Sequence, residues 1–335
     1  MKRVKFFYRT GLAVGLLTMA VLSMAKGQQL SPPMHDPCII QQDSTYYIFA
    51  TGWGIVRWSS TDLLHWKRLK PVFDTPPAWT AEDVRGFRGV FWAPDISYYK
   101  GTYYLYYAVS AFGKNTSCIG LATNRTLDDK SPLYHWVDRG KIVQSVPGRD
   151  MWNAIDPNLV VDSAGTPWLD FGSFWGGIKL VRLNPARTGI SDPPRWYTIA
   201  GRERTFGLAD SVAGNAAIEG PYIFRRGPYY YLFVSYDYCC RGIHSNYKMM
   251  VGRSRDVRGP YLDRDGVPMI RGGATLVLKG DKDWPGVGHN AILETGGKDY
   301  LVFHGYDAHD HGRSKLRILP LQWQEGWPVV EQPPK

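Results

Sequence analysis

Short runs of aromatic and apolar residues recur along the chain and predict β-strands. The most pronounced runs lie at residues 46–49, 103–106, 168–171, 229–232 and 300–303. Tyr, Trp, Phe and aliphatic residues bounded by Gly, Pro, Asp or Asn are typical of strands that alternate with turns. No stretch has the apolar period of a long amphipathic helix. The pattern therefore predicts an all-β fold with little helix.

A short phrase, in which a polar or acidic residue adjoins a proline or a glycine, precedes each of these runs. Its copies are His35-Asp36-Pro37, Ala93-Pro94-Asp95, Ile155-Asp156-Pro157, Glu219-Gly220-Pro221 and Gly288-His289-Asn290. They recur about every 60 to 70 residues, and a fixed period of this kind indicates a repeat architecture. Five four-stranded units can close radially into a propeller, which leaves only short strand edges. The sequence therefore predicts a five-bladed β-propeller.

Further short segments complete the predicted units. The fourth strand of the second unit is predicted at residues 134–137 and that of the third at 196–199, while the fourth unit is predicted as far as a strand at 248–254 and a turn at 259–261. No low-complexity linker separates the units, and an all-β fold of this length often forms one domain. We expect a single propeller domain over residues 28–335.

The N-terminus has the pattern of a secretory signal. Four basic residues precede an apolar run at residues 11–25, and small residues follow, so cleavage after Ala25 or Gly27 fits and residues 1–27 form the signal peptide. The alternative is a retained membrane anchor, for which the run is short. We expect an exported protein, periplasmic or extracellular, with no membrane contact once the signal is removed.

The charge and the motifs exclude several functions. The formal net charge is +10, but the basic residues are scattered without the long run that marks nucleic-acid binding, so no nucleic-acid partner is expected. A mildly basic surface favours an anionic matrix such as pectin, although it also fits an ordinary solvated surface. The chain has neither a phosphate-binding G-x-x-x-x-G-K-[ST] loop nor a G-x-S-x-G nucleophile motif. No organic cofactor is expected.

Four cysteines are even in number, which permits disulfides in an exported protein. Cys38, Cys118, Cys239 and Cys240 have no spacing that gives their connectivity, and no C-x-x-C metal motif is present. The sequence is compatible both with disulfides and with free thiols.

Ring closure would bring the repeated acidic residues to one place, and paired carboxyls favour glycoside hydrolysis. That reaction needs one protonated carboxyl and one ionised carboxylate, held at different pKa values by their surroundings. Asp36 has polar neighbours and suits the base, whereas Glu219 lies among apolar residues that raise a carboxyl pKa and suits the acid. Asp156 would be a third carboxylate, able to raise the pKa of its neighbour and to hold the sugar.

Each of these residues also has a structural interpretation. An Asp-Pro pair can simply begin a strand, but a repeated set is harder to explain in this way. Asp95 follows its proline rather than preceding it, so we expect a structural or supporting role. His289 occupies the fifth position and could hydrogen-bond a carboxylate or bind a cation. Four aromatic residues at strand starts or in loops are candidates to line a cleft: Trp92, Phe112, Phe174 and Trp175.

Taken together, the phrases resemble glycoside hydrolase family 43, and within it the endo-α-1,5-L-arabinanases. The resemblance covers nearly all of the chain after the signal. It rests on the five phrases above together with Phe91-Trp92, Asn153-Ala154, Ser173-Phe174-Trp175, Tyr222 and the pair Cys239-Cys240.

The resemblance implies a five-bladed propeller that hydrolyses internal α-1,5-L-arabinofuranosyl bonds of arabinan with inversion. It implies Asp36 as general base, Glu219 as general acid and Asp156 as pKa modulator and substrate holder. It further implies that the sugar contacts Asp36, Asn153, Ala154, Ile155, Asp156, Ser173, Phe174 and Trp175, with Trp92 and Phe112 beside them. His289 would bind a calcium or sodium ion otherwise held by water. Gly220 departs from the larger residue common at this position.

Two kinds of alternative compete with an endo-arabinanase. The first is a sister activity, namely an exo-acting arabinanase, an α-L-arabinofuranosidase or a β-xylosidase. The second is a non-catalytic carbohydrate-binding propeller, which would need the aromatic residues but not three carboxyls. In each case the partner is a polysaccharide, and we expect a monomer.

Overall fold

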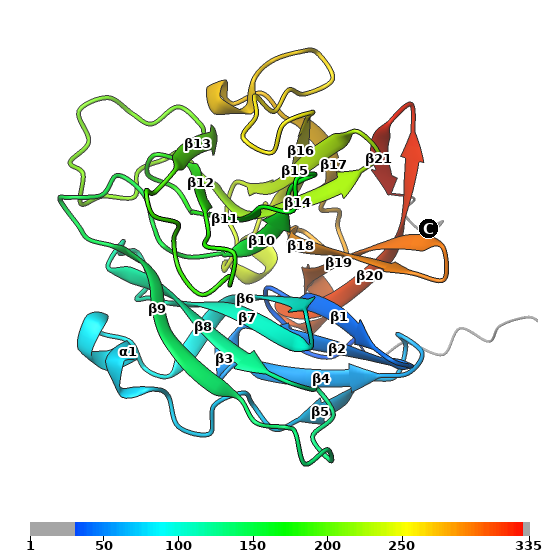
Figure 1. The fold of residues 1–335 in the computed structure, drawn as a ribbon. Helices are drawn as coiled ribbons and strands as arrows, with labels where there is room; N and C mark the ends of the chain where they lie inside the picture. Colours follow the sequence, from blue (N-terminus) through cyan, green and yellow to red (C-terminus); the bar gives the residue numbers. More distant parts are fainter. Residues whose placement is uncertain (1–30, 331–335) are drawn as a thin grey trace, which may run out of the picture. The chain divides into compact units, whose positions relative to one another are not determined.

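The computed structural model describes residues 31–330 and consists of five antiparallel sheets arranged as a five-bladed β-propeller (Figure 1). The strands of the first two blades are β1 Cys38–Gln42, β2 Thr45–Ala50, β4 Val56–Ser60, β5 Lys67–Leu69, then β6 Val90–Tyr99, β7 Thr102–Val109, β8 Ser117–Asn124 and β9 Val137–Ser145. A two-residue strand, β3 Gly52–Trp53, pairs with β6. The third blade contains β10 Asn158–Val161, β11 Pro167–Phe171, β12 Ile178–Arg182 and β13 Trp196–Ala200. The last two contain β14 Ile218–Arg226, β15 Tyr229–Tyr236, β16 Lys248–Ser254, β17 Thr275–Lys279, then β18 Val287–Thr295, β19 Lys298–Asp307, β20 Arg313–Gln324 and β21 Trp327–Val330.

The first strands of the five blades form a closed ring. Strand β1 contacts β6 and β18, β10 contacts β6 and β14, and β14 contacts β18. Backbone hydrogen bonds also tie the residues before β1 to the last blade. The Met34 N–H donates to Ser314 O, and the Leu316 N–H donates to Pro32 O, both at 3.0 Å. The beginning and the end of the propeller are thus joined directly.

The prediction of an all-β fold with little helix is confirmed. The described residues contain one short helix, α1 Ala78–Asp83, and three 3-10 turns, η1 Gly242–His244, η2 Met269–Arg271 and η3 Ala308–Asp310. None of the helices between residues 31 and 330 is long and apolar enough to cross a membrane. The predicted signal peptide lies outside the described residues.

Two outer strands differ from the sequence prediction. The fourth strand of the second blade is β9, at residues 137–145 rather than 134–137. Tyr134 instead lies before β9, where its hydroxyl accepts hydrogen bonds from Arg57 and from Trp136 Nε1. The fourth blade does have a fourth strand, β17, which the pattern did not indicate because its sequence, Thr-Leu-Val-Leu-Lys, follows a long irregular connection.

The repeated phrase corresponds to an unusual backbone conformation at the start of each blade. Positive φ angles occur at Asp36 (50°), Ala93 (39°), Asp156 (57°), Gly220 (57°) and His289 (55°). The pairing register shifts at this point in the second, fourth and fifth blades. Such irregularities bend a strand and re-aim its side chains, and they are common beside functional sites. Gly220 rather than Glu219 is therefore the conformational equivalent of Asp36, and Asp95 lies two residues beyond its own blade's equivalent, Ala93.

Candidate active site

Asp36 is buried at the start of the first blade, within a set of hydrogen-bonding side chains. Thr51 Oγ1 donates to its Oδ2 at 2.6 Å, and His35 Nδ1 lies 2.7 Å from the same oxygen. His289 Nδ1 and His304 Nδ1 lie 3.2 and 3.5 Å from Oδ1. Burial favours the neutral acid, but the imidazoles of His35 and His289 outweigh it and hold the pKa of Asp36 well below its usual range. Asp36 is therefore an ionised carboxylate.

The histidines around Asp36 are themselves positioned by the last blade. The His35 ring stacks on that of His304 with centroids 3.9 Å apart, and His35 Nε2 lies 2.8 Å from the Tyr306 hydroxyl. The Asp36 backbone N–H donates to His304 Nδ1 at 3.1 Å. Burial opposes a charge on His35, but the Asp36 carboxylate raises the pKa of His35 well above its usual range, so the two form a buried ion pair. Burial lowers the pKa of His304, which is neutral.

Glu219 has the opposite electrostatic setting. Burial raises its pKa, although hydrogen bonds from Ser173 and Tyr247 oppose this shift. Ser173 Oγ donates to Glu219 Oε2 at 2.8 Å. Glu219 is also half-buried rather than fully enclosed, which leaves it open to a ligand. A carboxyl with a raised pKa that remains accessible is suited to donating a proton.

Asp156 links the other two carboxyls. It is buried, and its Oδ2 accepts a hydrogen bond from the Gly220 N–H at 3.0 Å, directly beside Glu219. Burial and then the charges of Glu219 and Asp36 raise the pKa of Asp156 well above its usual range. The structure therefore brings Asp36, Asp156 and Glu219 from the first, third and fourth blades into mutual electrostatic contact.

His289 presents a neutral imidazole to this group. Burial lowers its pKa, and its backbone N–H donates to Ser235 Oγ at 2.8 Å. Gly220 lies against its ring, since a Cβ at Gly220 would come 3.0 Å from His289 Nδ1. Glycine therefore permits the close approach of the backbone to this ring. Both amide atoms of the adjacent Asn290 are buried without a protein partner. These features fit a single imidazole ligand with water as the other ligands of an ion.

Asp95 is kept apart from the three carboxyls by its own contacts. Its Oδ2 accepts hydrogen bonds from Asn158 Nδ2 at 3.2 Å and from the Leu159 N–H at 2.8 Å. Burial raises its pKa to about 7 despite these bonds. Asp95 thus holds the second and third blades together, in agreement with the expected structural role.

The residues predicted to contact sugar differ in accessibility. Phe112 is 82% exposed, whereas Trp92 and Phe174 are half-buried. Trp175 is buried, and its Nε1 donates to Asp210 O at 2.9 Å, so it anchors the loop before β14. Four others are also buried: Asn153, Ala154, Ile155 and Ser173. Of the polar ones, Ser173 reaches the carboxyls directly. Sugar contact by any of these residues stays a prediction.

Several side chains that support the carboxyls were not predicted from the sequence. Thr51, His304 and Tyr306 lie outside the repeated phrase, and His35 lies within it but was given no role. His304 and Tyr306 alternate on β19, so a period of two would place both on one face of that strand. Their proximity to Asp36 comes from ring closure, which local pattern does not show.

A five-bladed propeller that holds one ionised and one protonatable carboxyl together has the two catalytic groups that glycoside-cleaving enzymes use. The chain belongs to Glycosyl hydrolases family 43, whose model matches residues 30–328. The prediction of a family 43 enzyme is confirmed.

Curated relatives and solved structures of this family resemble the chain along most of its length. It is 48% identical to an extracellular exo-α-(1→5)-L-arabinofuranosidase of Cellvibrio japonicus, over 94% of this chain and 91% of that protein. It is 39% identical to an extracellular endo-α-(1→5)-L-arabinanase of Bacillus subtilis, over 98% and 97%. The solved α-L-arabinanase of Cellvibrio cellulosa in complex with arabinohexaose is 49% identical, with a TM-score of 0.89 over 90% of this chain and 96% of that one.

Proposed function

We propose that this protein hydrolyses α-1,5-linked L-arabinofuranosyl bonds of arabinan by acid/base catalysis. The opposite pKa shifts of Asp36 and Glu219 carry the proposal, since they supply an ionised base and a protonated acid at the same pH. The similarity to arabinan-cleaving proteins over nearly the whole chain supports arabinan as the substrate. The extracellular relatives support export, and hence a role on polysaccharide outside the cytoplasm.

The roles follow from the contacts. Asp36, kept ionised chiefly by the positive charge of His35, would take a proton from the attacking water. Glu219 would donate its proton to the glycosidic oxygen, with Ser173 fixing the orientation of the carboxyl. Asp156 accepts a hydrogen bond from the Gly220 N–H and would thereby restrain the adjacent Glu219 while it contacts the sugar. A calcium or sodium ion bound by His289 and water would supply positive charge that further favours the ionised form of Asp36.

We expect inversion at the anomeric carbon, because water attacks directly in a base-assisted step. Proton NMR of the first products from linear arabinan should show the β-anomer before mutarotation. A burst of the α-anomer would instead indicate a covalent intermediate and contradict the assignment of Asp36 as base.

Endo cleavage is the first prediction, and exo cleavage is the second candidate. The second is favoured because the exo-acting relative is 48% identical and the endo-acting one 39%. Chromatography of early products from debranched arabinan distinguishes them. We expect a spread of oligosaccharides from an endo enzyme, and one small product from the first minute would establish exo action. A matched digestion of xylan-derived oligosaccharides should give no product and so exclude a β-xylosidase.

A further inference from the structure

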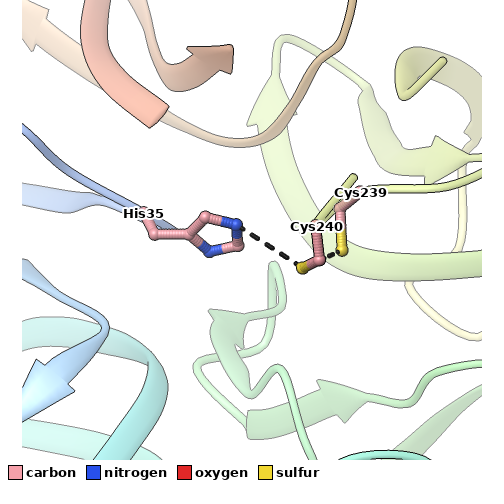
Figure 2. A group of neighbouring side chains, drawn as sticks. All are labelled: His35, Cys239 and Cys240. Atoms are coloured by element: carbon pink, nitrogen blue, oxygen red, sulfur yellow. Dashed lines mark hydrogen bonds between the residues drawn. The ribbon is translucent and has the colours of Figure 1, made fainter. Parts of the chain in front are cut away.

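A vicinal cysteine pair lies beside the base network, and the catalytic scheme does not use its sulfur atoms. The Cys239 and Cys240 sulfurs are 2.6 Å apart, and Cys240 Sγ lies 3.7 Å from His35 Nε2. Figure 2 shows the His35 ring directed toward Cys240, with Cys239 behind it. The four cysteines are free thiols, of which Cys38 and Cys118 are buried elsewhere.

The three side chains have the ligand types of a thiophilic metal site. Each contributes one donor atom, and the three atoms all lie within 4.8 Å of one another. Thiolate and imidazole ligands bind Zn²⁺ at about 2.3 Å and 2.0–2.1 Å, which corresponds to donor separations close to the observed sulfur-to-nitrogen distance. The two sulfurs, now 2.6 Å apart, would have to move apart by about 1 Å to admit the ion. Thiolates select soft or borderline cations over calcium and sodium.

One of the three ligands is already in the charge state that a cation binds, whereas the pKa values of His35 and Cys239 are raised well above their usual range, so an ion must displace a proton from each. A hydrogen bond from Cys239 lowers the pKa of Cys240 to about 5, and a bond from His35 adds to this effect although burial opposes it. His35 Nδ1 already faces Asp36, so Nε2 is the nitrogen directed toward the sulfur. Cys240 is exposed, which gives an ion a route from solvent and leaves its fourth ligand position open.

We propose that His35, Cys239 and Cys240 form a binding site for a soft or borderline divalent cation such as Zn²⁺ or Cd²⁺, and that its occupation inhibits hydrolysis. Binding would release to solvent the thiol proton of Cys239 and the proton between His35 and Cys240, with no change in the oxidation state of the metal.

Inhibition follows from two contacts. A cation bound to His35 Nε2 would break the contact of this nitrogen with the Tyr306 hydroxyl, which lies 2.8 Å away. It would thereby disturb the His35 imidazole, which keeps Asp36 ionised. The cation would also replace the proton at the Cys240 sulfur. The charge on this sulfur acts on Glu219 as well as on Asp36. The inhibitory effect rests on the proposed roles of these carboxyls, whereas metal binding does not.

The test is a cadmium titration of the full exported enzyme, purified without reductant. Thiolate-to-cadmium charge-transfer absorption in the ultraviolet reports binding, and hydrolysis of linear arabinan is followed in parallel. We expect one cadmium per chain, loss of activity with the same titration curve, and recovery of activity on adding a chelator.

Two variants make the test specific. Cys240→Ser should weaken cadmium binding by at least about 10–100-fold, the cost of losing even a residue that only orients a ligand. Cys118→Ala removes a buried thiol of β8 and should leave the titration unchanged.

Three results would overturn the proposal. One is the absence of the charge-transfer band, including the case in which thiol titration shows the pair to be oxidised. Another is an unchanged band in Cys240→Ser. The third is binding without inhibition, which would refute the inhibitory effect even if arabinan hydrolysis itself is established.

Discussion

Glu219→Gln should lower kcat on arabinan by about 10²–10⁴-fold, the usual contribution of a general acid, while substrate binding is retained. The amide preserves the shape of the side chain and can still bond to Ser173, but it has no proton to give to the leaving oxygen. Initial rates and equilibrium binding of an arabino-oligosaccharide measure the two effects separately.

The leaving group supplies a control within the same variant. An aryl arabino-oligosaccharide with an acidic phenol needs little protonation, so Glu219→Gln should recover much of its rate on that substrate. Because the pKa of Glu219 is raised, the activity of the wild-type enzyme on arabinan should fall as the pH rises through that pKa. The pH profile of Glu219→Gln on the aryl substrate should lack this fall in activity at high pH. Glu203→Gln, an exposed carboxyl in the loop before β14, should behave as wild type. An equal loss on both substrates would contradict the assignment of the acid.

Asp36→Asn should lower kcat by a similar factor, about 10²–10⁴-fold, on both arabinan and the aryl substrate. Water must be activated whatever the leaving group, so a better leaving group cannot restore the rate. Asn is among the residues that tolerate a positive φ, so the backbone at this position should be kept. Initial rates on the two substrates, with circular dichroism as a check of folding, test this expectation.

The surface offers a matched pair for comparison. Asp62 Oδ2 lies 2.7 Å from His65 Nδ1, the same distance as in the Asp36–His35 pair, but both side chains are far more exposed. Asp62→Asn removes an aspartate–histidine contact without touching the carboxyl group of the site. Its activity should match that of wild type, and an equal loss in the two variants would argue against Asp36 as base.

The repeated phrase was sufficient to predict the number of blades and the meeting of three carboxyls. It worked because the same backbone irregularity recurs at Asp36, Asp156 and His289, and an irregularity of this kind restricts the residues that can occupy it. The alignment of Glu219 with Asp36 was wrong by one residue, because Gly220 holds the equivalent conformation. The pattern identified an acidic residue next to the irregular position, but not the residue that adopts the positive φ angle.

The support around the carboxyls could not be predicted for a physical reason. His304 and Tyr306 are separated from His35 by most of the chain, and only closure of the ring brings them together. The burial of Trp175 depends likewise on the loop that covers it, through its bond to Asp210. Sequence pattern reports periodicity within a strand, whereas these contacts depend on how separate blades pack.

The backbone hydrogen bonds between residues 32–34 and β20 bear on the stage of synthesis at which the chain becomes able to hydrolyse its substrate. Asp36 is among the first residues of the propeller to be synthesised, but His289 and His304, which contact its carboxylate, belong to the last blade. A nascent chain with four finished blades therefore holds all three carboxyls but lacks the two imidazoles that fix the Asp36 carboxylate in place. We expect hydrolysis only once the final blade docks against the first.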